Sequence, residues 1–252
     1  SMSQSTESTT ESNPFTKPGF IIAAALVVAL IAAAVVIFLL PKGQDTAQPA
    51  PGTTASANPA TAGTSATAGA GKSVCGLPSG TETALGAAPK SKWELVGKMA
   101  APTDPKTFGP GVTDGDGFRS CFANSPTGAL YAAANMIALG SSGTQDELKL
   151  AEKLLVPGPG RDAAIAEAKT RTSTARSGET AQVSGFLIKS YSPAEADVDL
   201  AIKLPNGALA HSVLSLRWVP GDWKVKASDD GQIFNGVAQL SDLSGFILWS
   251  GV

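Results

Sequence analysis

The sequence predicts a membrane-anchored α+β protein whose folded domain packs helices on an antiparallel sheet. Three observations lead to this prediction: an uninterrupted apolar run at residues 20–40, helical spacing of apolar residues between residues 125 and 176, and alternation after Gly178. Helices followed by antiparallel strands place the helices on one sheet face. We therefore divide the chain into a disordered cytoplasmic tail (1–18), a transmembrane helix (19–41), a flexible stalk (42–72) and an extracytoplasmic domain (73–252).

The composition excludes several classes of function. Of the 252 residues, 43% are hydrophobic and 16% are charged, which argues against a wholly disordered chain. The 19 basic and 21 acidic residues nearly balance, so we expect no direct binding to nucleic acid. One histidine and two cysteines are too few for a Cys/His zinc site or a histidine-dependent nucleophile. We therefore predict no catalytic residue, no cofactor and no metal, and hence no enzyme.

The anchor is predicted from residues 20–40, which read FIIAAALVVALIAAAVVIFLL. At about 1.5 Å per residue this helix is roughly 31 Å long, which matches a hydrocarbon core of about 30 Å. A cleaved secretory signal is the alternative, but its apolar core is about 7–15 residues long and is followed by small residues, whereas this run ends in FLLP. Ala25, Ala29 and Ala33 form a small-residue row that would let two helices pack as a homo-oligomer, the alternative being an Ala-rich span without a partner.

The orientation follows from the stalk and the cysteines, because Lys17 and Lys42 flank the anchor symmetrically. Residues 42–72 are mostly Ala, Thr, Gly, Pro and Ser, a flexible composition with a typical reach of roughly 30 Å. Beyond them lie Cys75 and Cys121, whose pairing in a disulfide is expected in an oxidising compartment. Two free thiols are the alternative. We therefore place the tail in the cytoplasm and the large domain outside.

The domain opens with proline-punctuated sequence. Between residues 73 and 119 only residues 93–96 indicate a short strand, so we expect irregular structure wrapped around the domain. Ser125 and Pro126 then supply an N-cap and a first-turn proline for a helix that Gly140 ends.

Two further helices precede the strands. Residues 144–147 (TQDE) form a capping box for a helix that Pro157 ends, and an Ala-rich helix is expected over residues 161–176. Asn206-Gly207 is the strongest hairpin signal in the chain, and residues 220–222 (PGD) make a second tight turn. The final apolar run is read as an edge strand or docking segment. The expected strands are residues 182–191, 194–204, 208–219, 223–227 and 245–249.

Several motifs suggest chemistry but have simpler explanations. Residues 69–73 (GAGKS) end like a phosphate-binding loop but lack its first glycine, and residues 114–117 (DGDG) lack the remaining ligands of a calcium loop. His211 is predicted to be a strand-surface or satisfied core histidine. Asp197 and Asp199 share a strand face, as a catalytic pair requires, but the alternating pattern favours a solvated face. Trp218, Trp223 and Trp249 are expected to pack in the core or in hairpins, and the alternative is a ligand cage.

Both the order of the segments and several short sequence motifs resemble known proteins. The tail, single span, stalk, helices and four-stranded meander resemble the VirB-eight-like and TcpC-like scaffold subunits of conjugation and type IV secretion machines. That resemblance implies a curved sheet in a nuclear-transport-factor-two-like (cystatin-like) fold over residues 93–252. Mce-associated membrane proteins share the layout. Local phrases also resemble uncharacterised membrane-anchored proteins of actinobacterial mobile elements: CFANSPTGA at 121–129, AAAN at 132–135, GF at 185–186, LRW at 216–218 and GDWK at 221–224.

The resemblance implies a single-pass scaffold or adaptor that binds other envelope proteins, as part of a conjugation or type IV secretion-like channel. An envelope ligand-binding module, or a transport accessory protein of the Mce-associated type, is the alternative. We expect the partner-contact surface at the loop of residues 109–119, with Phe118 and Arg119 as contact residues, and at exposed positions of the helix that follows Ser125.

Overall fold

The computed structural model describes residues 71–142, 144–171 and 181–252. The predicted tail, the predicted membrane helix and nearly all of the stalk lie outside the described residues. In the part that is described, no helix is long and apolar enough to cross a membrane.

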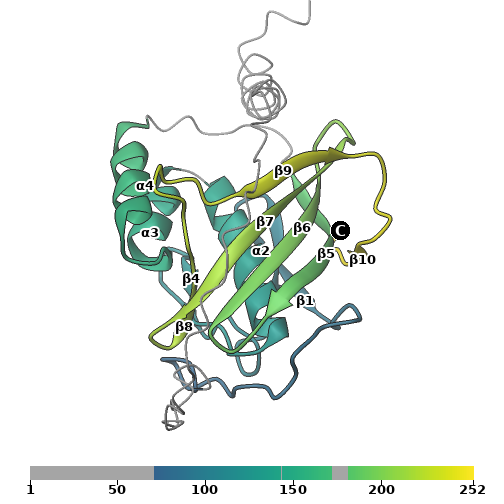
Figure 1. Cartoon of the computed structure of the whole chain (residues 1–252), viewed down its shortest axis with the longest axis horizontal. Coiled ribbons are helices and arrows are strands. Elements are labelled where there is room, and N and C mark those ends of the chain that lie inside the picture. Colours follow the sequence, from purple (N-terminus) through teal and green to yellow (C-terminus); the bar gives the residue numbers. More distant parts are fainter. Residues whose placement is uncertain (1–70, 143, 172–180) are drawn as a thin grey trace, which may run out of the picture. The chain divides into compact units, whose positions relative to one another are not determined.

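An antiparallel sheet from the second half of the chain forms the centre of the domain (Figure 1). Its strands follow the order β10-β5-β6-β7, and the far edge of β7 is shared by β8 and β9. The fold class is therefore α+β, as predicted. The strands are β5 (Gln182–Tyr191), β6 (Glu195–Lys203), β7 (Leu209–Val219), β8 (Asp222–Val225), β9 (Asn235–Leu240) and β10 (Ile247–Leu248).

Both predicted turns are confirmed. Gly207, with φ of 84°, closes the β6–β7 hairpin, where the Leu204 N–H donates to the Ala208 carbonyl. Gly221, with φ of 79°, turns β7 into β8. Glycine adopts such a conformation at the lowest steric cost, so its presence at these two positions indicates the turns. The resulting register places Val198 opposite Leu214, on the face that packs against the helices.

The helices are α2 (Pro126–Ser142), α3 (Thr144–Leu154) and α4 (Pro159–Thr170). The Ser125 hydroxyl accepts the Gly128 N–H at 2.9 Å, which confirms the predicted N-cap. The first helix continues two residues past Gly140, and the third begins at Pro159 rather than at residue 161. That third helix ends at Thr170, because Arg171 is already extended. Residues 172–176 of its predicted span lie outside the described residues.

The first part of the domain is more regular than predicted. Residues 73–91 contain no helix or strand, as expected, and the strand predicted at 93–96 is β1 (Lys92–Val96). The structure adds β2 (Met99–Thr103), which pairs with β1, and a small hairpin of β3 (Val112–Thr113) and β4 (Arg119–Ser120). The β2 strand was missed because all five of its residues are buried, which removes the alternation that marks a half-buried strand.

Of the two alternatives for the C-terminal apolar run, the structure shows the edge strand. Ile247 and Leu248 of β10 pair with Phe186 and Gly185 of β5. Trp249 then turns into the core, where its ring lies 5.6 Å from Phe186 between ring centroids. Trp249 therefore packs into the core at the β10 edge of the sheet, opposite the edge formed by β8.

Candidate interaction surface

The predicted contact residues Phe118 and Arg119 are not on the surface. Phe118 is 1% exposed and Arg119 is 6% exposed. The Arg119 guanidinium donates to the side-chain Oδ1 of Asn135 in α2 at 3.3 Å and forms an ion pair with Glu94 of β1. The expectation that Phe118 and Arg119 are exposed contact residues is therefore wrong, because both lie at or just before the start of β4, where their side chains turn into the domain. Residues 112, 113 and 115–117 of the same loop are exposed, as expected.

The other predicted contact surface, on α2, is also covered. Every residue of this helix from Pro126 to Leu139 is buried. A helix that is apolar all round belongs in a core, and α2 is packed by the sheet, by the β1–β2 hairpin and by α3. No position in these turns of α2 is available to a partner.

The acidic loop before β4 is an ion-paired turn. The Asp114 and Asp116 carboxylates accept hydrogen bonds from the Lys149 ammonium of α3 at 2.7 and 2.8 Å. The hydrogen bond from Lys149 lowers the pKa of Asp116. Lys149 also lies 4.6 Å from the centroid of the Phe118 ring. Both carboxylates therefore have a cationic partner, and the loop is an ion-paired polar turn.

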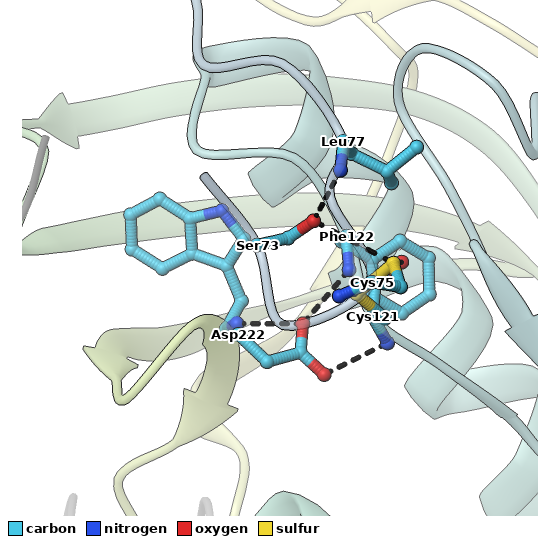
Figure 2. The surroundings of a disulfide bond; sticks show 7 residues. Ser73, Cys75, Leu77, Cys121, Phe122 and Asp222 are labelled. Atoms are coloured by element: carbon cyan, nitrogen blue, oxygen red, sulfur yellow. Dashed lines mark hydrogen bonds between the residues drawn. A yellow bond between two sulfur atoms is a disulfide. The ribbon is translucent and has the colours of Figure 1, made fainter. Parts of the chain in front are cut away.

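The predicted disulfide is present between Cys75 and Cys121, with Cα atoms 6.3 Å apart (Figure 2). It holds residues 73–77, which we call the strap, against the domain. Within the strap the Leu77 N–H donates to the Ser73 hydroxyl at 2.8 Å, and the Val74 N–H donates to the Gly221 carbonyl at 2.8 Å. Ser73, the end of the phosphate-loop-like motif, thus has a local structural role.

A buried carboxylate lies beside the disulfide (Figure 2). Asp222 accepts the backbone N–H groups of Cys121, Phe122 and Trp223, each at 2.8 Å. Cys121 has φ of 67°, an unusual value for a residue other than glycine, and it is held there from both sides by the disulfide and by Asp222. Burial raises the pKa of Asp222 to about 6, although the hydrogen bonds from the three amides act in the opposite direction.

On the sheet face opposite the helices, Asp199 is 4% exposed, so the predicted solvated face is wrong at this residue. Its carboxylate contacts the His211 Nδ1 atom at 2.9 Å. Phe246, from the β9–β10 connection, covers this face, with its ring centroid 5.8 Å from that of His211. Asp197 accepts hydrogen bonds from the Ser190 and Ser215 hydroxyls instead. The two carboxylates therefore have separate hydrogen-bond partners.

The tryptophans and the histidine behave as structural residues. Trp223 is fully buried and meets Trp218 edge-on at 5.3 Å between centroids. His211 is satisfied by Asp199, and in the described chain no group of three or more metal-ligating side chains includes it.

An open hollow of about 630 Å³ lies at the end of the sheet near the β6–β7 turn. Leu248 is 66% exposed at its wall and Val252 is 83% exposed. Lys203 adds a cation, and among the described residues it has no ion-pair partner. The lining residues are Ser184, Lys203, Gly207, Leu209, Leu243, Leu248, Trp249, Ser250 and Val252.

Sequence reasoning missed both Asp222 and the hollow. Asp222 was read only as part of a turn, because its partners Cys121 and Phe122 are 100 or more residues away in the chain. The hollow combines residues from β6, β7 and the C-terminal segment. The exposed apolar C-terminus was its only local signal.

Comparison with known proteins gives one match. No curated protein and no solved structure matches the chain. A family model described as a domain of unknown function, DUF8175, matches residues 54–248. This range begins within the predicted stalk and includes both cysteines, the sheet and the helices, and it covers well over half of the sequence. The chain therefore belongs to the DUF8175 family.

Proposed function

We propose that this protein is a single-pass membrane scaffold or adaptor of a bacterial envelope assembly, and that its extracytoplasmic domain acts by binding other proteins. The sequence resembles scaffold subunits of conjugation and type IV secretion machines, which have cystatin-like outer domains. We therefore propose that the assembly is a channel of that kind. The membrane helix is the segment predicted at residues 19–41.

The observation that carries the proposal is the hollow. Four aliphatic residues and Trp249 line it, together with polar residues and Lys203, which has no ion-pair partner in the described part of the chain, and it is open to solvent. Exposed apolar surface with a polar rim is typical of protein contact sites. We infer that the occupant is a protein segment that inserts aliphatic side chains and brings a carboxylate to Lys203.

The disulfide supports the location of the domain outside the cytoplasm. Cys75 and Cys121 are bonded, and such bonds persist in oxidising compartments. A stalk with a reach of roughly 30 Å would then confine the domain near the membrane and raise its effective concentration toward neighbouring envelope proteins. At a raised effective concentration, weak contacts at a small hollow suffice for binding to these proteins.

The location has a direct test. A periplasmic or extracellular reporter fused after Val252 is expected to be active, and protease added to spheroplasts is expected to remove the domain. Protection of the domain from external protease contradicts the orientation.

The contact surface is tested by photo-crosslinking in intact cells. A photoreactive residue at position 248 is expected to crosslink to defined envelope proteins. The same residue at position 74 is the matched control, because Val74 is also an exposed aliphatic residue, at 71%, and contacts Gly221 at the opposite end of β7. Lys203→Glu is expected to lower the yield from position 248 several-fold without changing thermal stability, since Lys203 is exposed.

Two results contradict this assignment of the surface. One is equal crosslinking to the same proteins from positions 248 and 74, and the other is an unchanged yield in Lys203→Glu. A small molecule of fixed mass that co-purifies with the chain and is lost in the Lys203 variant favours the alternative, a ligand-binding module, since 630 Å³ lies within the volume range of small-molecule sites.

A further inference from the structure

The β9 strand is an open edge of the sheet. It pairs with β7 on one side, and among the described strands none pairs with its other side (Figure 1). All six of its residues are exposed or half-buried, and Phe234 just before it is 38% exposed. The N–H and C=O groups on the free side of such a strand are a template for a further strand.

The usual protection of an edge strand is reduced here. Residues 235–240 (NGVAQL) contain neither a charged residue nor a proline, which are two common devices that block strand addition. A third device, a bulge, occurs only at the start, where Gly236 has φ of 58° and the register shifts between His211 and Val213 of β7. Val237, Ala238, Gln239 and Leu240 therefore remain able to pair.

Charge at the two ends of β9 indicates the kind of segment that fits. Asp229 and Asp230 precede the strand, Asp242 follows it, and residues 227–252 contain no lysine or arginine. Hydrogen bonds from the Ser228 and Ser244 hydroxyls lower the pKa of Asp230 and Asp242, respectively, so both stay ionised at mildly acidic pH. A second copy of this edge would add only acidic ends, which disfavours self-pairing.

We propose that β9 is the docking site for an extended segment of a partner protein that adds a strand to the sheet and carries lysine or arginine on both sides of an uncharged stretch. The proposal rests on the proposed function, because the occupant is a protein. It names the partner's chemistry and uses a different surface from the hollow. The two surfaces adjoin, since Leu240 of β9 is opposite Leu209, which lines the hollow.

Backbone geometry supplies an internally controlled pair of variants. Ala238 and Gln239 are opposite His211 and Ala210 of β7. Neighbouring residues of an antiparallel strand alternate, so one of these two N–H groups points toward β7 and the other points outward. Proline at the inward position removes a bond within the sheet and destabilises the fold, whereas proline at the outward position removes only a bond to the partner strand. One of Ala238→Pro and Gln239→Pro is therefore expected to keep the melting temperature of the wild type.

The binding test uses the full chain in detergent micelles and a labelled peptide of alternating threonine and valine with two lysines at each end. The matched control peptide has glutamates at both ends. Fluorescence anisotropy is expected to show about tenfold tighter binding of the lysine peptide, as several weak surface ion pairs together provide. This difference is expected to shrink as salt is raised to about 0.5 M. The stable proline variant is expected to bind the lysine peptide at least tenfold more weakly.

Three results overturn the proposal: no binding of the lysine peptide, equal binding of the two peptides, or unchanged binding by the stable proline variant. None of them affects crosslinking from position 248, which tests the proposed function separately. If crosslinking from position 248 persists but the lysine peptide does not bind, the protein binds partners through the hollow and β9 has no role in docking.

Discussion

Removing the bond between Cys75 and Cys121 tests how the strap stabilises the domain. The two residues are 46 apart in the sequence. In the chain-entropy model, closing a loop of about 46 residues stabilises the folded state by about 4 kcal/mol. The Val74 hydrogen bond to Gly221 and the burial of Leu77, which is 5% exposed, do not depend on the sulfur–sulfur bond, so they leave this difference unchanged.

We therefore expect the Cys75→Ala/Cys121→Ala variant to unfold about 8–16 °C below the oxidised wild type, since about 1 kcal/mol corresponds to 2–4 °C for a domain of this size. Thermal unfolding followed by circular dichroism measures the shift, and urea unfolding gives the free energy. The reduced wild type is the matched control, because it loses the crosslink but keeps both side-chain volumes.

Two outcomes refute the reasoning. If reduction moves the melting temperature of the wild type by less than about 2 °C, loop closure contributes little and the strap is held by other contacts. If the reductant also lowers the melting temperature of the double variant, its effect does not pass through this disulfide.

Three further predictions concern single residues. Phe118→Ala is expected to lower the free energy of unfolding by about 3–5 kcal/mol in urea denaturation, because the ring is 1% exposed, and a change below about 1 kcal/mol contradicts its place in the core. Gly128→Ala is expected to destabilise by more than about 1 kcal/mol, because its Cβ atom would lie 1.9 Å from the Ala123 carbonyl oxygen; Gly140→Ala, which meets nothing within 4 Å, is the control and is expected to be neutral or stabilising. Burial raises the pKa of Asp222 from 3.8 to about 6, so the folded chain holds this proton more tightly than the unfolded chain. This group's contribution to stability, about 3 kcal/mol, is then complete below about pH 4 and lost as the pH rises through about 6. Asp222→Asn is expected to remove that component from the pH dependence of urea unfolding, and identical pH profiles for variant and wild type contradict it.

The parts of the fold that were predictable have local causes. The β6–β7 and β7–β8 turns depend on Gly207 and Gly221, whose positive φ values are a property of the residue itself. The start of α2 depends on Ser125, which bonds a backbone amide three residues ahead. Signals of this range are contained in a few consecutive residues, so they can be interpreted without knowing what packs against them.

The wrong predictions concern burial that is decided by distant segments. Asp199 follows an alternating pattern that indicates a solvated face, but Phe246, 47 residues later in the chain, helps to cover that face. Phe118 follows a loop rich in glycine and aspartate, and its burial depends on α3, whose Lys149 and Lys153 lie over its ring. The β9 strand is not predicted because its residues are exposed or half-buried, so the sequence shows no alternation of apolar and polar residues there.

The arrangement along β7 relates the strap to the proposed contact surfaces. Near one end of this 11-residue strand, Val74 of the strap bonds Gly221 and the buried Asp222 holds the backbone of Cys121. At the other end lie Leu209 and the hollow, about 33 Å away at the usual rise of a strand. The disulfide fixes the strap at one end of β7, and the contact surfaces lie at the other end. Because β7 is paired on both edges, we expect it to be stiff. Loss of the disulfide would free the strap without changing the hollow itself, so binding of a purified partner should survive reduction even where assembly in the cell does not.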